Sequence, residues 1–345
     1  MTKKSRILAM LLIALMILSG CQAKKASENE ELPKEPIKKE EVLDPEKLEI
    51  EAFFDKYIYT KERPIAIMID NDNEQARPHA GLDEAYLIYE MIIEGGAARF
   101  MALYKGDATE KIGPVRSSRH YFLDYVMEND AIYTHYGWSP KAQTDIAAFK
   151  INKINGVLGG DGSIFWREKK YKGDWHSAYT SIEKISDMAD KKKYKRETAH
   201  QNSIGYSDEY LNMETETVAN NVNLNYSYKY KTGYIYNPET KLYEKTINGK
   251  PHSMQNGNVL KVKNIIIQLI GDTPLGDGTD RRNINTTGSG KGYYITDGYC
   301  KSITWSKSSR TANTIYKDES GTPLLINPGK TIINIISPKS KTTIE

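Results

Sequence analysis

The start of the chain limits which residues can belong to the folded protein. It carries a short apolar run behind three basic residues. Lys3, Lys4 and Arg6 precede the twelve apolar residues 7–18. A helix that spans a bilayer core needs about 20 apolar residues, so this run is too short for a membrane span. The pattern is typical of a secretory signal that is removed after export. We therefore expect residues 1–20 to be a signal peptide.

The apolar run ends in Leu18-Ser19-Gly20-Cys21, which looks like a lipobox. The small residues before Cys21 let a signal peptidase approach the bond, and the cysteine thiol accepts a diacylglycerol. A two-chain lipid gives stable attachment without a spanning helix. We expect a lipoprotein that Cys21 holds on the extracytoplasmic face of the cell membrane of a Gram-positive-type cell. The alternative is an ordinary signal peptide with a chance cysteine.

Residues 21–50 have the composition of a tether, because Lys and Glu dominate and prolines are scattered among them. Such a segment buries too little apolar surface to offset the entropy lost on ordering. We therefore expect a disordered charged tether that lifts the folded part off the membrane. The alternative is a short charged helix over residues 45–54, with Asp44 as N-cap and Pro45 at the first position.

The charge balance and the cysteine count of the mature chain argue against a nucleic-acid-binding protein and against a fold held by intramolecular disulfides. Removal of residues 1–20 leaves 45 basic and 45 acidic side chains. A near-zero net charge argues against nucleic acid as a partner, since that binding requires a basic surface. Once Cys21 is lipidated, Cys300 is the one thiol left, so we expect no intramolecular disulfide. The fold must rest on its core, and the length suffices for two domains.

Residues 51–210 show strand and helix signals that alternate, which predicts an α/β domain with a mixed sheet and helices. A two-glycine turn at residues 95–96 predicts a hairpin. Ser117 or Ser118 is a candidate N-cap, and Ser139 before Pro140 is another. The strand signals are residues 65–69, 86–94, 97–105 and 131–136, and the helix signals are residues 117–126, 139–149 and 182–192.

Residues 211–345 differ in pattern, because short strand signals are separated by turns rich in Gly, Asn, Asp and Pro. This pattern predicts a β-rich second domain. Residues 288–292 (GSGKG) suggest a phosphate loop, but Asn285 and Gly292 break the required pattern, so we expect a turn before a strand. The strand signals are residues 221–236, 242–246, 259–270, 292–296, 302–306 and 331–336.

Short motifs along both parts point to one family. They are residues 77–81 (RPHAG), 94–100 (EGGAARF), 113–121 (GPVRSSRHY), 165–167 (FWR), 288–294 (GSGKGYY), 303–305 (ITW) and 327–331 (NPGKT). Together they resemble the YerB family of lipoproteins, which carries a two-part domain called DUF3048. One family motif contains a histidine, and His176 in residues 174–177 (DWHS) corresponds to it. The residues on either side of His176 differ from those of the motif. The resemblance implies the localisation and the fold, but no settled biochemical activity.

A looser analogy gives the alternative function. The order of strand, hairpin, arginine motif, strand and helix is reminiscent of the LytR-CpsA-Psr phosphotransferases at the level of fold. Arg116 and Arg119 would then stand where such enzymes hold a lipid pyrophosphate. This alternative is an envelope phosphotransferase or hydrolase that acts on a lipid-linked (pyro)phosphate glycan and uses Mg²⁺. The first hypothesis requires no cofactor.

The candidate anion-binding residues lie in the first part of the chain. Arg116 and Arg119 are three residues apart at a predicted helix start, where guanidinium groups and free N–H groups favour an anion. The alternative is internal pairing with Glu90, Glu94 or Asp70. The full candidate set is Arg77, His79, Arg99, Arg116, Arg119 and His120.

Three tryptophans, Trp138, Trp166 and Trp175, are candidates for stacking on sugar rings, and core packing is their alternative. No complete catalytic motif is present, so we predict no catalytic residue. No pair of histidines has zinc-ligand spacing, so we predict no metal site. The first hypothesis is therefore a non-catalytic envelope lipoprotein that binds a peptidoglycan component or regulates a cell-wall enzyme. A variant of it makes residues 211–345 the protein-contact module.

Overall fold

The computed structural model describes residues 44–106, 108–200 and 203–345. The predictions for the signal peptide, for Cys21 and for the tether up to residue 43 lie outside the described residues. The described residues form one compact unit. Its helices are α1 (Pro45–Phe53), η1 (Phe54–Ile58), η2 (Glu74–Ala76), η3 (Leu82–Glu84), η4 (Glu94–Gly96), η5 (His120–Phe122), α2 (Leu123–Glu128), α3 (Pro140–Ala148), η6 (Asp161–Ile164) and α4 (Ile182–Lys191).

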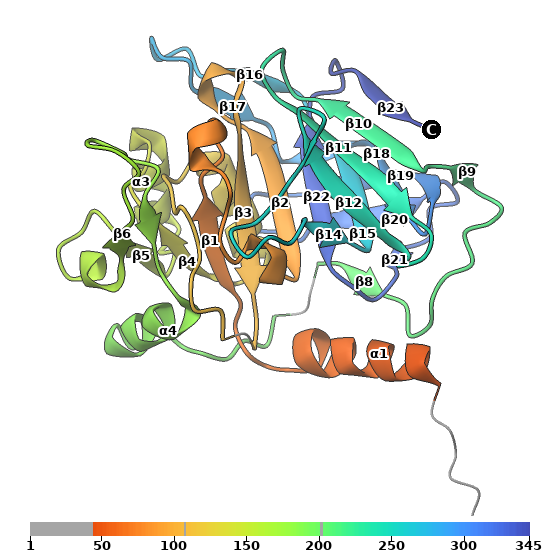
Figure 1. Ribbon diagram of the computed structural model, residues 1–345, viewed down its shortest axis with the longest axis horizontal. Coiled ribbons are helices and arrows are strands. Elements are labelled where there is room, and N and C mark those ends of the chain that lie inside the picture. Colours follow the sequence, from red (N-terminus) through yellow and green to blue (C-terminus); the bar gives the residue numbers. More distant parts are fainter. Residues whose placement is uncertain (1–43, 107, 201–202) are drawn as a thin grey trace, which may run out of the picture. The chain divides into compact units, whose positions relative to one another are not determined.

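A large mixed sheet runs through the middle of this unit (Figure 1). Across the sheet its strands are β20 (Ile315–Asp318), β19 (Tyr299–Lys307), β18 (Gly288–Thr296), β15 (Asn264–Leu269), β22 (Thr331–Ile336), β2 (Leu87–Ile92), β3 (Ala98–Tyr104), β1 (Ile65–Ile69), β4 (Ile132–His135) and β5 (Lys153–Asn155), and β9 (Thr217–Val218) pairs with β19. The pairs β15–β22, β22–β2, β1–β4 and β4–β5 are parallel.

A smaller antiparallel sheet packs on one face of the large sheet. One hydrophobic cluster contains Tyr234 and Tyr243 of the small sheet together with Ile267 and Ile332 of the large sheet. The small sheet has the order β13 (Lys250–Pro251), β12 (Leu242–Ile247), β11 (Lys231–Asn237), β10 (Asn221–Asn225) and β23 (Thr342–Ile344), with β14 (Lys261–Val262) paired to β12. Three separate strand pairs are β16 (Asp272–Pro274) with β17 (Arg282–Ile284), β21 (Leu325–Ile326) with β8 (Gly205–Tyr206), and β6 (Trp166–Arg167) with β7 (Ala178–Tyr179).

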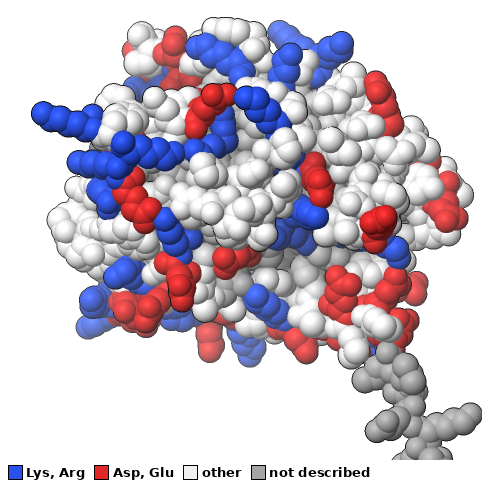
Figure 2. Space-filling model, viewed as in Figure 1, with Lys and Arg blue, Asp and Glu red and all other residues white. Residues whose placement is uncertain are grey.

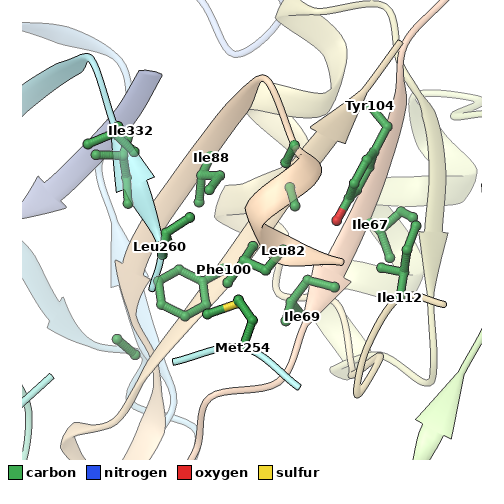
Figure 3. Packing of buried hydrophobic residues seen from close by; sticks show 14 of the residues in the cluster. Ile67, Ile69, Leu82, Ile88, Phe100, Tyr104, Ile112, Met254, Leu260 and Ile332 are labelled. Atoms are coloured by element: carbon green, nitrogen blue, oxygen red, sulfur yellow. The ribbon is translucent and has the colours of Figure 1, made fainter. Parts of the chain in front are cut away.

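The two parts predicted as residues 51–210 and 211–345 share one core. β2 of the first part pairs in parallel with β22 of the second, with Ile88 opposite Ile332. Figure 3 shows Met254 and Leu260 of the second part packed beside Phe100 of the first part. The predicted fold class, an α/β region followed by a β-rich region, is confirmed, and the boundary near residue 210 falls within one compact unit.

Local signals explain several elements. All five residues of β1 are buried, as the apolar run predicts for a strand inside a sheet. In α3 the Ser139 side chain accepts a hydrogen bond from the Ala142 amide, and Pro140 occupies the first turn. In α1 the Asp44 side chain accepts from the Glu46 amide. The tether prediction is therefore wrong for residues 45–50, where the alternative of a short charged helix holds.

Two further local predictions are wrong. Neither Ser117 nor Ser118 caps a helix, because the chain is still extended at Arg119 and helical turns begin at His120. The glycine-rich residues 288–292 form the start of β18 rather than a turn. A Cβ at Gly292 would lie 2.4 Å from the Ile267 carbonyl oxygen, so the close approach of β15 explains this glycine.

Candidate functional site

Two carboxylates follow the carboxyl end of β1. The amide of Asp70 donates to the Pro114 carbonyl at 2.8 Å, and the amide of Arg116 donates to the Met68 carbonyl at 2.9 Å. These bonds bring the Arg116 side chain to the end of β1, beside Asp70 and Asp72. The end of an interior strand is a common place for functional side chains, because the sheet fixes their positions.

Three cationic or neutral donors surround these carboxylates. Nδ1 of His176 lies 2.7 Å from Oδ2 of Asp70. The guanidinium of Arg116 lies 3.1 Å from Asp70 and 3.6 Å from Asp72. Arg99 donates to Asp72 at 2.5 Å and to the Ser117 carbonyl at 2.7 Å. We call these five residues, Asp70, Asp72, Arg99, Arg116 and His176, the ionic cluster.

Hydrogen bonds and neighbouring charges outweigh burial in setting the protonation states of Asp70 and Arg99. Burial alone raises the pKa of Asp70, but the hydrogen bond from His176 and the charges of Arg99 and Arg116 outweigh it, so the pKa lies below its usual value. Burial likewise lowers the pKa of Arg99, but the charges of Asp72 and Asp70 raise it above its usual value. The carboxylate and the guanidinium therefore remain charged around neutral pH.

A pair of buried histidines lies behind the ionic cluster. Nε2 of His79 donates to the Asp70 carbonyl at 2.6 Å, so its Nδ1 accepts from Nε2 of His252 at 2.8 Å. Burial lowers the pKa of His79 to about 3 and that of His252 well below its usual value. Nδ1 of His252 has no hydrogen-bond partner among the described residues. Both rings are neutral and serve as structural hydrogen-bonding groups.

The exposed indole of Trp175 lies beside Arg116 of the ionic cluster. The Trp175 side chain is 64% exposed, and the guanidinium carbon of Arg116 lies 5.9 Å from the centre of its ring. Asp174 fixes the backbone on either side, because its carboxylate accepts from the His176 amide at 2.8 Å and from the Lys170 amide at 3.0 Å. The indole is therefore exposed, and the backbone that carries it is held in place.

The segment that carries Trp175 is anchored and basic. Lys170 donates to the carbonyls of Gln75 and Arg77, and the Tyr171 hydroxyl donates to the Gln75 side chain at 2.7 Å. Residues 167–173 are all exposed and carry four cations and one carboxylate. Figure 2 shows Lys and Arg side chains gathered on the left of this face, where Figure 1 places α3 and β6. Trp175, Arg116 and residues 167–173 form what we call the Trp175 face.

The other predicted anion-binding residues lie at or beyond the edge of the ionic cluster. Arg77 donates to the Asn71 side chain at 2.6 Å. Arg119 pairs with Glu94, and one of its bonds measures 2.9 Å. His120 contacts the Asn283 side chain at 2.9 Å, and burial lowers its pKa. The predicted alternative of internal pairing therefore holds for Arg116 with Asp70 and for Arg119 with Glu94.

The other two predicted stacking residues are less available than Trp175. Trp166 donates to the Glu168 carboxylate at 2.8 Å and stacks on Tyr179, with ring centres 6.4 Å apart. Trp138 is half-buried and packs on His135, with ring centres 5.6 Å apart. Of the three predicted stacking residues, Trp175 presents its ring to solvent most fully.

Within residues 44–106, 108–200 and 203–345, no helix is long and apolar enough to cross a membrane. In the same residues, no group of three His, Cys, Asp or Glu side chains is arranged to hold a metal ion.

Comparison with known proteins decides the family. Residues 55–195 match the N-terminal domain, and residues 222–333 the C-terminal domain, of a family described as "Protein of unknown function (DUF3048)". The chain is 32% identical over 286 residues to the protein named "Putative lipoprotein YerB" of Bacillus subtilis, which covers 80% of this chain and 82% of that protein. The chain belongs to the YerB-like DUF3048 family.

The YerB-like fold has also been seen in a solved structure. The crystal structure of YerB from Bacillus subtilis matches with a TM-score of 0.72 and 28% identity, over 82% of this chain and 94% of that one. The ionic cluster falls wholly within the matched N-terminal domain, whereas His252 belongs to the matched C-terminal domain. The lipoprotein prediction agrees with the name of the relative.

Sequence reasoning missed one residue of the ionic cluster and two residues beside it. Asp72, Asn73 and His252 were not predicted as site residues, although Asn73 lies 3.3 Å from Nε2 of His176. The signal that marks Asp72 is its place in the polar run after a buried strand. Asp174, which fixes the Trp175 backbone, has no comparable signal because its partners are backbone amides.

Proposed function

We propose that this chain is a non-catalytic lipoprotein of the cell envelope whose Trp175 face binds a glycan that carries carboxylates or phosphates. A lipid on Cys21 attaches it to the outer face of the cell membrane. The glycan is a cell-wall component, and through it the protein is brought to the enzymes that build or remodel the wall. The observation that carries this proposal is the exposed indole of Trp175 beside Arg116, on a backbone that Asp174 ties down.

The argument from Trp175 is one of preorganisation. An apolar ring that is 64% exposed gains little from its own protein, yet its backbone is tied down through Asp174. Because the backbone is already ordered, little backbone entropy is lost when a ligand covers the ring. Sugar rings present flat C–H faces that suit an indole, and hydroxyl groups that suit charged neighbours. These features favour a glycan over a purely apolar ligand.

The argument for negative charge comes from the surrounding cations. Arg167, Lys169, Lys170 and Lys172 are exposed in one short segment, with Glu168 as the one carboxylate there. Arg116 keeps about a quarter of its side chain exposed at the edge of the ionic cluster. Exposed cations attract an anionic polymer over a range of about 10 Å at moderate salt. Binding should therefore weaken as salt is raised.

The arrangement of His176 favours binding over catalysis. Its Nδ1 contacts Asp70 and its Nε2 lies 3.3 Å from the Asn73 amide nitrogen, so both ring nitrogens are engaged. A general base needs a ring nitrogen directed at its substrate. His176 instead holds Asp70 beside Arg116, and we assign it a positioning role.

The proposal is tested with the full chain in detergent micelles and purified wall sacculi. Retention is measured at low and high salt, before and after removal of the anionic wall polymers. We expect retention at low salt that falls in Arg116→Ala and survives in Arg281→Ala, a half-buried arginine on the β16–β17 hairpin. No retention by either form of the sacculi would contradict the proposal.

A parallel arm with inorganic pyrophosphate distinguishes the enzyme alternative. Mg²⁺-dependent pyrophosphate binding that is lost in Arg116→Ala, with no retention on sacculi, would replace the binding protein by a phosphotransferase or hydrolase.

A further inference from the structure

The small sheet ends in an edge strand that, among the described residues, has no neighbour on one side. In the part of the chain that the structure describes, β23 pairs with β10 alone, with Val222 opposite Ile344 and Leu224 opposite Thr342. The amide of Asn221 donates to the Glu345 carbonyl at 2.7 Å, and the amide of Glu345 donates back at 2.9 Å. Figure 1 shows β23 at the upper right, beside β10.

The alternation of an antiparallel pair fixes which groups of β23 point outward. Because Glu345 bonds to β10, the backbone groups of Ile344 and Thr342 point to the opposite side. Exposed edges of this kind are templates for an added strand. Oγ1 of Thr342, which is buried, also has no hydrogen-bond partner among the described residues.

A cavity of about 540 Å³ lies along this outer side of β23. Thr342 and Ile344 form one wall, and Tyr293 of β18 and Cys300 of β19 are among the residues of the large sheet that line it. The apolar parts of these side chains can receive alternate side chains of an extended segment, while its backbone pairs with β23.

The rim of the cavity is acidic. Glu216, Asp318 and Glu319 contribute three carboxylates, and Lys301 contributes one cation that lies 3.3 Å from Glu216. The local charge therefore selects basic over acidic segments.

We propose that the β23 edge receives an extended segment of a partner protein in which apolar residues alternate with Lys or Arg. The segment adds as a further strand of the small sheet, with its apolar side chains in the cavity and its basic side chains near Glu216 and Glu319. This surface is separate from the Trp175 face. It gives the protein a second contact, so a partner can bind while the glycan is held.

The test uses the full chain in detergent micelles and a fluorescent eight-residue peptide of alternating valine and lysine. A second peptide carries glutamate in place of lysine. We expect the lysine peptide to bind and to slow hydrogen exchange at the amides of Thr342 and Ile344, and we expect the glutamate peptide to bind about tenfold more weakly or not at all. Equal binding of the two peptides, or no binding of either, would overturn the proposal.

Two variants locate the binding. Ile344→Pro removes an outward N–H and blocks an added strand, so it should abolish binding. Since proline could disturb the sheet, Glu319→Lys is the second variant, and it should weaken the lysine peptide about threefold. Glu239→Lys, on the exposed turn between β11 and β12, is the matched control and should bind as the unaltered chain does.

Two other outcomes are distinguishable: the peptide binds elsewhere on the protein, or a second copy of this chain occupies the β23 edge. Peptide binding that is unchanged in both Ile344→Pro and Glu319→Lys would place the peptide elsewhere and overturn the proposal. A concentration-dependent dimer that the Ile344→Pro change abolishes, with no peptide binding, would make a second copy the occupant and overturn the partner proposal as well.

Discussion

Nδ1 of His176 lies 2.7 Å from Oδ2 of Asp70, a carboxylate that is fully buried. This contact joins the segment between β6 and β7 to the end of β1. Since Trp175 directly precedes His176, the position of the exposed indole depends on a buried ion pair network. The stability of the fold and the geometry of the Trp175 face are therefore linked through Asp70.

Asp70→Asn should destabilise the protein by about 3 kcal/mol, because Arg116 and Arg99 would then face a neutral amide in a buried position. Urea unfolding at pH 7 measures this change. The matched control is Asp187→Asn on the exposed side of α4, where we expect a change within about 0.5 kcal/mol. Equal effects of the two substitutions would contradict the role given to Asp70.

The buried histidines His79 and His252 should make the protein less stable in mild acid. Burial lowers the pKa of His79 to about 3 and that of His252 well below its usual value. In the unfolded chain both histidines have a pKa of about 6.5. Between about pH 6.5 and pH 3 the unfolded state therefore binds more protons than the folded state, and the free energy of unfolding decreases as the pH is lowered. We expect each histidine to contribute about 2 kcal/mol of the fall between pH 7 and pH 5.

His252→Gln tests this assignment. The free energy of unfolding is measured in urea at pH 7 and at pH 5 for the unaltered chain and for the variant. The variant should be less sensitive to pH by about 2 kcal/mol, whatever its stability at pH 7. A variant with the same pH dependence as the unaltered chain would show that His252 is not held neutral in the folded protein.

The buried pair of Glu90 and Lys245 should couple the two parts of the chain. The two charges lie 3.0 Å apart, and both side chains are inaccessible to solvent. Lys245→Met should cost about 3–5 kcal/mol because it leaves the Glu90 charge unpaired, and adding Glu90→Gln should restore part of this loss. A double-mutant cycle should give a coupling of at least about 1 kcal/mol. Additive effects would contradict a shared core.

The sequence predicted those elements whose signals are local. The N-cap Ser139 before Pro140 gives α3, and the glycines at residues 95–96 give the β2–β3 hairpin. The pairing of β2 with β22 could not be predicted, because a parallel pair between distant segments leaves no mark in a single sequence. The two parts therefore looked like separate domains, although they complete one sheet.

For the candidate site, too, residue type and local sequence were informative, whereas contacts between distant segments were not. Arg116 was predicted as a candidate for anion binding, with internal pairing to Glu90, Glu94 or Asp70 as the alternative, and the structure shows the pair with Asp70. The difference in exposure between Trp175 and Trp138 could not be predicted, because it depends on Asp174 and on contacts with Gln75 of η2. Residue type indicated candidates for stacking, and only the structure indicated which ring faces solvent.

The most direct test of the account is the retention of Trp175→Ala on purified sacculi, with Tyr228→Ala as the control. Both side chains are exposed, Trp175 at 64% and Tyr228 at 86%, so neither substitution should change stability by more than about 0.5 kcal/mol. We predict that Trp175→Ala weakens retention about fivefold, or about 1 kcal/mol, and that Tyr228→Ala leaves it unchanged. Retention of Trp175→Ala equal to that of the unaltered chain would contradict glycan binding at the Trp175 face.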